Sequence, residues 1–349
     1  MKKFLVILFA FFYSFCFSQE TDTTAVEDYS MYGEAELAGG GKRFCTSKVF
    51  DLSPNKLISI GYDYQSSYKL NLGAIGSNAG QEITTSNNYG LRVAANVPVI
   101  SKTNVLLNIG ATYWDNFYSF DKETAVNPLA RSLQKYGLRT MGLNFTLFKP
   151  LNEKSFFILN GSGDLNGNYS FNDFQPLSYT KISATGFYGW KKHDRLMYGF
   201  GIARSYRVGE ANYFPVFLYN YTFKNRKWGV ETLFPAKAAL RRTFNSRTLA
   251  FFGYELEGNS YLIRNRGNEF APGIDNLELR RGELRVRCVF ERSIKDFLWV
   301  SIQAGWRYNY RFNVDEKEFF RGFGDDPYLA TNKLTNPLFV NFSINLVSP

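Results

Sequence analysis

The amino-acid sequence predicts an all-β fold, an antiparallel up-and-down transmembrane β-barrel of about 14 strands, with 12 or 16 strands as the alternatives. Three observations predict this class. The chain begins with a short secretory segment, hydrophobic and polar residues alternate over long stretches, and the connections between these stretches are mostly short and long in turn. After residue 18, no stretch of the sequence approaches a membrane-spanning helix in length and hydrophobicity.

The first 18 residues have the pattern of a secretory signal peptide. Lys2 and Lys3 precede an almost wholly apolar run at 4–17, which is shorter than the roughly 20 residues of a spanning helix. Cys16 and Ser18 supply small residues where a signal peptidase prefers them. We therefore expect cleavage after Ser18. Lipidation of Cys16 is the alternative, which the bulky Phe15 before it disfavours.

The mature chain is expected to divide into a polar leader at 19–54 and one barrel domain at 55–349. The sequence contains 34 Phe, 23 Tyr and 5 Trp among 349 residues, while Asn, Ser, Gly, Lys and Arg dilute its hydrophobic residues. Strands that face lipid on one side and a polar lumen on the other have this composition. A soluble β-sandwich has a similar composition, so strand length has to separate the two classes.

In the predicted strands, one face is apolar and the other is polar or small. The apolar faces of five strands consist of Ile58, Ile60, Tyr62 and Tyr64; Tyr89, Leu91, Val93, Ala95 and Val97; Val105, Leu107, Ile109, Ala111 and Tyr113; Leu298, Val300, Ile302, Ala304, Trp306, Tyr308, Tyr310 and Phe312; and Leu338, Val340, Phe342, Ile344 and Leu346. The predicted strands at 276–291 and 297–312 are much longer than the usual soluble strand. A tilted membrane strand needs about 9–11 residues, so this length favours a barrel over a sandwich.

The connections support the same architecture. Short polar turns are predicted at 101–103, 151–154, 191–194, 224–227, 245–247 and 293–296, and longer connections at 70–87, 116–135, 166–176, 263–275 and 313–334. Periplasmic turns and external loops alternate in this way in outer-membrane barrels, which places the N-terminus and the short turns in the periplasm. The exception is a pair of short strands around Pro235, at 228–234 and 236–244.

Four segments carry a resemblance to a known family. They are GVETLFPAKAALRR at 229–242, FGYELEGNSYLI at 252–263, ELRRGELRVRCVFERSIKDFLWVSIQAGWRY at 278–308 and, more loosely, NYGLRVAANVPVISKTNVLLNIGATYWD at 88–115. In these segments the chain resembles an uncharacterised family of outer-membrane β-barrels from Bacteroidota-type bacteria. The resemblance implies a barrel in the outer membrane of a Gram-negative cell and carries no established activity. The chain departs from the usual barrel-insertion signal because it does not end on an aromatic residue; Phe342 is the nearest.

Charged residues follow one face of the predicted strands at 248–262 and 276–291. A charge on the lipid face near mid-membrane costs about 2–4 kcal/mol, so the phase that turns these residues into the lumen is preferred. The predicted ladder of lumen charges comprises Lys237, Glu255, Glu257, Arg281, Glu283, Arg285, Arg287 and Arg307.

A hairpin centred on 269–270 and the neighbouring turns predict which charges meet across the strands. The expected neighbours are Glu255 with Arg285, Glu257 with Arg281 or Glu283, Lys237 with Glu255, and Arg307 with Arg281. One interpretation of the ladder is a charged constriction or solute-binding wall. The other is a salt-bridged lumen that fills and stiffens the barrel, and the nearly balanced signs favour it.

Catalytic and metal-binding chemistry is poorly supported. His193 is the single histidine and lies in a predicted turn, next to no candidate nucleophile. Cys45 and Cys288 do not make a zinc site, and Cys288 is expected to face lipid. A calcium site in the last long connection would need ordered ligand spacing. The acidic residues there are Asp315, Glu316, Glu318, Asp325 and Asp326, and their spacing is not ordered.

We therefore expect no enzyme activity, no cofactor, no metal and no nucleic-acid partner. The expected surroundings are outer-membrane lipid and glycolipid, and the formal net charge of +10 is compatible with anionic solutes. The leading hypothesis is a passive channel or small-solute transporter with a charged lumen. The alternatives are a closed structural or surface-binding barrel and, less well supported, an outer-membrane hydrolase. The sequence leaves the solute, the loop partners and the oligomeric state open.

Overall fold

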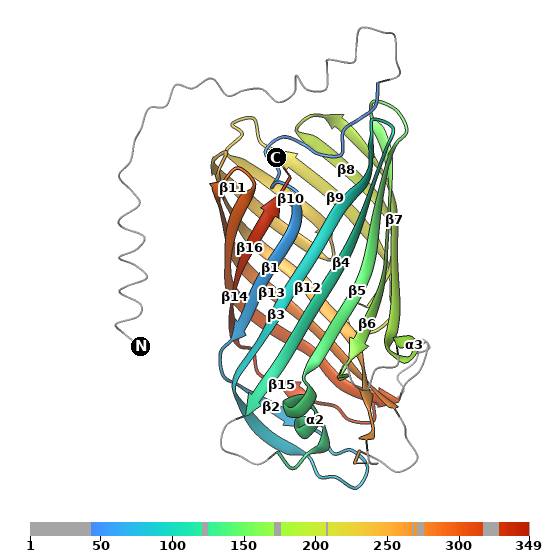
Figure 1. Ribbon diagram of the computed structural model, residues 1–349, viewed down its shortest axis with the longest axis vertical. Coiled ribbons are helices and arrows are strands. Elements are labelled where there is room, and N and C mark those ends of the chain that lie inside the picture. The colour runs from blue at the N-terminus through green and yellow to red at the C-terminus, as the bar shows by residue number, and fades with distance from the viewer. Residues whose placement is uncertain are drawn as a thin grey trace, which may run out of the picture. The chain divides into compact units, whose positions relative to one another are not determined.

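The first wall strand pairs along both of its edges, and this pairing closes the sheet into a barrel. In the computed structural model, β1 (Lys56–Gln65) pairs with β16 (Leu338–Val347) on one side and with β3 (Gln81–Lys102) on the other. The structure describes residues 43–348, except 121–124, 171–175, 207–208, 267–268, 271–275 and 317–327. Within these residues every wall strand is antiparallel to its neighbours (Figure 1).

The other wall strands follow each other around the barrel in chain order. They are β4 (Val105–Phe120), β5 (Leu138–Pro150), β6 (Ser155–Gly167), β7 (Thr180–His193), β8 (Leu196–Ser205), β9 (Asn212–Thr222), β10 (Trp228–Phe234), β11 (Lys237–Asn245), β12 (Thr248–Arg264), β13 (Asn276–Lys295) and β14 (Leu298–Glu316). Two short strands add no wall position, because β2 (Tyr68–Leu72) continues along β3 where β1 ends and β15 (Lys333–Leu334) pairs with β2. The predicted count of 14 strands is confirmed.

Short turns and long connections lie at opposite ends of the barrel. The turns after β3, β5, β7, β9, β11 and β13 are short, and the C-terminus lies at the same end (Figure 1). The hairpin of β10 and β11 turns at Pro235 and Ala236, which confirms the predicted exception. We name the two ends the short-turn end and the long-connection end.

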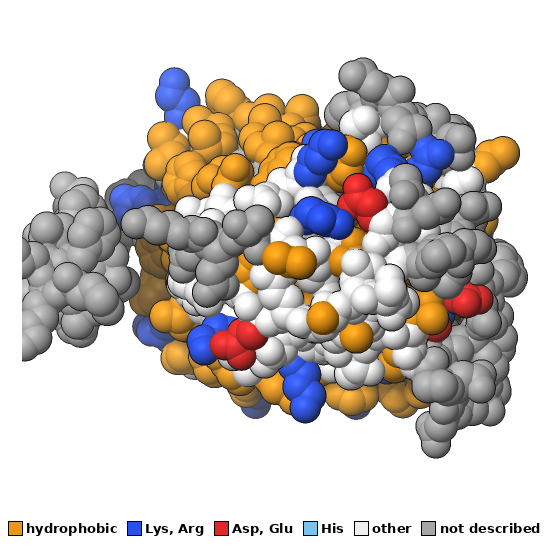
Figure 2. Space-filling view, turned by 90° about the horizontal axis from the view of Figure 1, so that it is seen from below, with side chains coloured by type: hydrophobic (Ala, Val, Ile, Leu, Met, Phe, Trp, Pro, Cys, Tyr) orange, Lys and Arg blue, Asp and Glu red, His pale blue; other side chains and the backbone are white. Residues whose placement is uncertain are grey.

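The outer face of the wall is apolar over a continuous belt. Ile60, Ile302 and Phe342 are adjacent or near neighbours on β1, β14 and β16, and each exposes about half of its surface: 52%, 50% and 47%. Hydrophobic side chains also gather on the flank of the barrel seen from the long-connection end (Figure 2). A belt of this kind is stable in contact with lipid rather than water. The predicted phase of these strands is confirmed, and Cys288 is exposed on the same face.

Phe312 was predicted to face outward, and this prediction was wrong. The register between β13 and β14 shifts at Gly282 and Glu283, so that Tyr310 is an extra residue on β14. A bulge of one residue turns the rest of a strand over. Phe312 therefore points inward opposite Arg281 and exposes only 2% of its surface.

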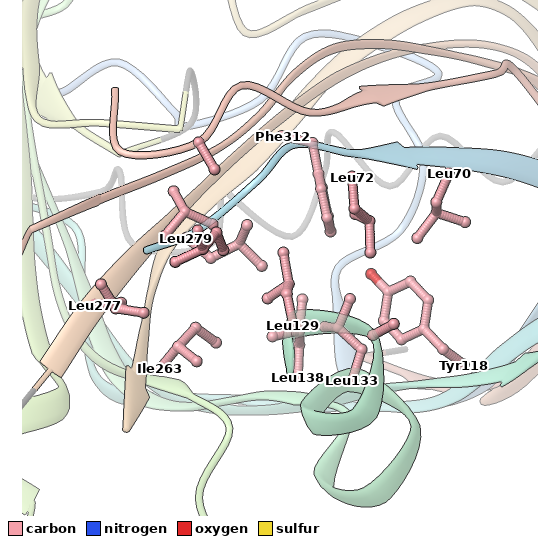
Figure 3. Close-up of a cluster of buried hydrophobic side chains, with 14 of the residues drawn as sticks. Leu70, Leu72, Tyr118, Leu129, Leu133, Leu138, Ile263, Leu277, Leu279 and Phe312 are labelled. Atoms are coloured by element: carbon pink, nitrogen blue, oxygen red, sulfur yellow. The ribbon is translucent and has the colours of Figure 1, made fainter. Parts of the chain in front are cut away.

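A helix closes the long-connection end. α2 (Pro128–Tyr136) begins after Asn127, whose side chain accepts a hydrogen bond from the amide of Leu129, and ends at Gly137, which has φ 63°. Leu129 and Leu133 of α2 are fully buried among side chains from β2, β12, β13 and β14 (Figure 3). The sequence analysis predicted only a long connection here and missed the signals of this helix, which are Asn127 and Pro128 at its start and Gly137 after its end.

A second helix, α3 (Pro176–Tyr179), follows β6. Among the residues that the structure describes, no helix is long and apolar enough to cross a membrane.

At the long-connection end, the β12–β13 hairpin contacts β6. Leu262 of β12 pairs in parallel with Gly167 of β6, and the amide of Asn168 donates a hydrogen bond to the Leu262 carbonyl at 3.1 Å. Leu262 is buried against Tyr169 and Tyr179. Because β12 and β6 are not sequential neighbours in the wall, this contact joins two separate parts of the barrel.

We predict that Ile302→Lys, which places a charge in the apolar belt, lowers the free energy of unfolding by about 2–4 kcal/mol, because the ammonium group would face lipid. Urea unfolding in lipid vesicles measures the change. Leu151→Lys is the control, since Leu151 lies in a short turn and is 46% exposed. An equal loss of stability in both variants would contradict the membrane assignment of the belt.

Candidate functional site

The middle of the lumen holds a group of charged side chains that we name the central charge cluster. Its members come from β1, β3, β12, β13 and β14. They are Asp63, Arg92, Glu257, Arg281, Glu283, Arg285 and Arg307. Strand alternation turns all of them inward, and barrel closure brings the β1 and β3 residues against the β12–β14 residues.

Glu283 is the centre of this cluster. Its Oε1 accepts from Arg285 Nε at 2.7 Å, and its Oε2 accepts from Arg281 Nη2 at 2.9 Å and from Arg307. The Glu283 side chain is 1% exposed, and the three arginine side chains are 2–3% exposed. A carboxylate buried to this degree is stable in its charged form only because cations and hydrogen-bond donors surround it.

Arg92 and Asp63 continue the cluster toward the short-turn end. Arg92 donates through Nε to Asp63 and through Nη2 to Glu257 at 2.6 Å. Arg285 Nη1 lies 3.0 Å from the other oxygen of Glu257, so Glu257 joins the two guanidiniums. Asn341 holds the second oxygen of Asp63 at 2.7 Å. Every carboxylate of the cluster thus has at least two donors.

Aromatic rings cover the guanidiniums. Arg92 and Arg281 lie over the ring of Trp114, at 4.5 and 5.1 Å from its centroid, and Arg285 lies 5.1 Å from the Phe339 ring. Each ring excludes water from a cation while attracting it through the electron density of its face. Trp114 is inward-facing because β4 alternates Trp114, Asn116 and Tyr118 on the lumen side.

The structure places the predicted ladder residues in two groups. Glu255 lies opposite Arg285 in register, Glu257 opposite Glu283, and Lys237 opposite Glu255. Arg281, Glu283, Arg285, Glu257 and Arg307 join the central charge cluster. The rest of the ladder lies nearer the short turns, where Arg287 pairs with Glu255 at 2.6 Å.

Arg307 does not lie opposite Arg281, as the turn geometry had suggested. Its register partner is Arg285, because the β13–β14 turn sets Ser293 opposite Trp299 and this register continues unbroken to Glu283 and Asn309. Arg281 and Arg307 nevertheless meet at the same oxygen of Glu283.

Two members of the cluster, Asp63 and Arg92, were missed as site residues. Strand alternation did place both on the non-lipid face of their strands. Their partners lie in β12 and β13, more than 160 residues away along the chain. A pairing of this kind depends on barrel closure and cannot be found by folding one hairpin.

At the short-turn end, residues 43–55 cross the mouth of the barrel, and we name this segment the strap. It hydrogen-bonds to successive turns: the Cys45 amide donates to Asn152 at 3.0 Å and the Phe50 amide to Asp194 at 2.8 Å. Asp51 accepts two hydrogen bonds from Arg226, each 3.0 Å. Most of the strap belongs to the predicted polar leader at 19–54. The structure describes the leader from residue 43 onward, and this part contacts the barrel.

The strap packs on an apolar patch of the lumen. Cys45 and Val49 are 6% and 5% exposed and contact inward-facing side chains of β5–β9, including Phe156 and Met197. Burial raises the pKa of the Cys45 thiol, so this thiol stays protonated and unreactive near neutral pH. The last part of the strap then reaches β13, where Ser53 Oγ donates to Glu291 at 2.8 Å.

A cavity of about 170 Å³ lies in the lumen beside the central charge cluster, and Arg92 of the cluster lines it. Lys56 borders it and donates to one oxygen of Glu291 at 2.6 Å, while Ser53 donates to the other oxygen. The other polar side chains around this lumen cavity come from β1, β3, β14 and β16. They include Ser59, Arg92, Gln303, Asn341 and Ser343.

The remaining candidate residues have ordinary surroundings. His193 ends β7 at the short-turn end and accepts a hydrogen bond from the amide of Arg195. Asp315 pairs with Arg280 at 3.3 Å, whereas Glu318, Asp325 and Asp326 lie outside the described residues. Among the residues that are described, no group of three or more His, Cys, Asp or Glu side chains could hold a metal ion.

The apolar belt, the closed wall and the charged interior define a transmembrane β-barrel. Within that class, the chain belongs to the family described as a domain of unknown function (DUF6268), whose model matches residues 57–346. The resemblance to an uncharacterised family is thereby confirmed at the level of a family without known function. No curated protein matches the sequence.

Three solved structures show a distant likeness in fold. An outer membrane channel from Pseudomonas putida F1 is 12% identical, over 84% of this chain and 97% of that one, with a TM-score of 0.37. The Pseudomonas putida toluene transporter TodX is 7% identical, over 87% of this chain and 95% of that one, with a TM-score of 0.34. A Pseudomonas aeruginosa FadL homologue is 9% identical, over 84% of this chain and 90% of that one, with a TM-score of 0.37. At these values, conclusions about this chain have to come from its own residues.

We predict that Glu283→Gln lowers the free energy of unfolding by about 3–5 kcal/mol, because three buried guanidiniums lose their common carboxylate. The matched control is Glu255→Gln, whose side chain is 24% exposed and whose loss is expected to cost less. Urea unfolding of both variants measures the difference. If the two changes cost the same, the cluster does not organise the interior.

Proposed function

We propose that this protein is an outer-membrane channel that lets a small solute pass through the barrel lumen and is closed in the conformation described. The observation that carries the proposal is the hydrophilic interior: a polar cavity and a charge cluster lie in line between the two mouths. A barrel of eight strands is filled by its own side chains, and one of 16–18 strands contains an open channel. Fourteen strands leave room for a narrow path.

Closure of the path rests on two features. The strap crosses the mouth at the short-turn end and is held by separate hydrogen bonds to neighbouring turns. At the other end, α2 and its apolar neighbours fill the lumen beyond the cluster. The strap is the more easily displaced of the two, since the outer part of its contact surface consists of hydrogen bonds and an ion pair near water.

The barrel and the predicted signal peptide support a location in the outer membrane. We place the belt in the outer membrane, with the short turns and the strap in the periplasm and lipid and glycolipid around the wall. The Bacteroidota-type origin that the sequence resemblance implies stays a prediction.

A second candidate function is a closed barrel that serves as a structural or surface-binding protein. The buried ion pairs and the apolar plug of α2 favour it, since both fill the lumen. The two functions differ in whether ions ever cross the barrel.

We predict that the refolded mature protein gives discrete, reproducible current steps in a planar bilayer, with long closed intervals. The closed intervals follow from the strap and the filled interior. Single-channel recording measures both, and refolding buffer without protein serves as the control. Efficient insertion without any current would favour the closed structural barrel.

We predict that Val49→Asp increases the open fraction, because a carboxylate cannot stay in the apolar patch beneath the strap. In a Cys288→Ser background, Cys45 is the one described thiol, and a water-soluble maleimide should label it faster once the strap is released. Ser47→Asp adds the same charge at an exposed strap position and should change neither readout. Faster labelling with an unchanged open fraction would show that the strap is not the gate.

A further inference from the structure

The lumen cavity is bordered by more positive than negative charge. In the central charge cluster, four guanidiniums face three carboxylates, so the cluster as a whole carries one net positive charge. The other cations near the cavity are matched, because Lys56 pairs with Glu291 and Arg287 with Glu255. A charge inside a barrel that is left without a counter-charge is costly, so an excess cation attracts an anion.

Arg92 is the member of the cluster at which this excess meets the cavity. Its side chain is 30% exposed, whereas those of Arg281, Arg285 and Arg307 are 2–3% exposed. Nε and Nη2 of Arg92 bind Asp63 and Glu257, and Nη1 has no hydrogen-bond partner among the described residues. Arg92 lines the cavity, so Nη1 is a charged donor available to a solute there.

The rest of the lining is rich in donors. Gln303 uses its amide oxygen to accept from Arg287 at 2.7 Å, which leaves its amide nitrogen to donate. Ser343 accepts from Asn345, which leaves its hydroxyl hydrogen. Asn341 donates its amide nitrogen to Asp63 and thereby offers one acceptor, its carbonyl oxygen. Arg92, Gln303 and Ser343 thus offer donors to the cavity, whereas Asn341 and Ser59, whose hydroxyl hydrogen bonds to Asn345, offer acceptors.

The size of the cavity limits the ligand. The cavity has a volume of about 170 Å³. Pockets for drug-sized molecules have about 300–1,000 Å³. A solute of a few non-hydrogen atoms fits.

We infer that the lumen cavity is a binding site for a small oxyanion, of the carboxylate or phosphate class, held between Arg92 and Gln303. The guanidinium supplies charge and the amide and hydroxyl groups supply further hydrogen bonds to the oxygens. This inference rests on the proposed channel function, in which the site is the step at which anions are preferred over cations.

The first test is binding, which does not require conduction. The thermal unfolding midpoint of the full mature protein in detergent is measured with increasing sodium acetate. Ionic strength is kept constant with the bulky anion 2-(N-morpholino)ethanesulfonate, and phosphate replaces acetate in a second series. Acetate should raise the midpoint of the wild-type protein, since a ligand that binds only the folded state stabilises it. Arg92→Gln should abolish the rise and Arg92→Lys should keep part of it.

The matched control is Arg247→Gln, which makes the same change at an exposed short turn. If Arg92→Gln does not refold, Gln303→Leu removes a donor from the cavity without changing any charge and should also abolish the rise. The inference is overturned if acetate has no effect on the wild-type protein, or if it raises the midpoint equally in the cavity variants and in Arg247→Gln.

The second test is the reversal potential in a potassium chloride gradient. The wild-type channel should prefer chloride to potassium, and Arg92→Gln should reduce this preference several-fold while Arg247→Gln leaves it unchanged. Acetate binding without any current would support the anion site and contradict the proposed channel function. Current with neither acetate binding nor dependence on Arg92 would support the channel function and contradict the anion site.

Discussion

A carboxylate that is cut off from water must gather its own counter-charges, and Glu283 meets this requirement with three arginines from two strands. Much else in the interior depends on this arrangement. Arg285 has to reach Glu283 from the same strand while it also binds Glu257, which in turn fixes Arg92 and Asp63 on the far side of the closure. A slip of β13 against β14 by one residue would turn these side chains into the lipid, so the ion pairs and the strand register support each other.

Strand alternation was sufficient to predict the wall. It gave the number of strands, the lipid-facing side of β1 and β16, and the register that sets Glu255 opposite Arg285. These features are local, because each follows from a two-residue period and from the length of one turn. The prediction failed at Phe312, where a single extra residue, Tyr310, turns the strand over. Nothing in the residue types around Tyr310 marks that bulge.

The candidate site could be predicted only in part, for a different reason. The β12–β14 charges come from sequential hairpins, whereas Asp63 and Arg92 reach them only when the first strand pairs with the last. The strap was missed because it is short and has little periodicity of its own, whereas α2 was missed although Asn127, Pro128 and Gly137 mark its ends. Both segments are ordered by the surfaces they cover. Sequence patterns describe a segment, and these features are properties of contacts between distant segments.

The contact between β12 and β6 has a mechanical consequence. A thin-walled tube deforms most easily by flattening into an ellipse, and a strut between two separated points of its wall opposes that motion. Leu262 and Gly167, with Asn168 bonded to the same carbonyl, form such a strut near the long-connection end. The barrel is therefore stiffest at that end, and thermal changes in its cross-section are concentrated toward the short turns, where the strap spans the opening.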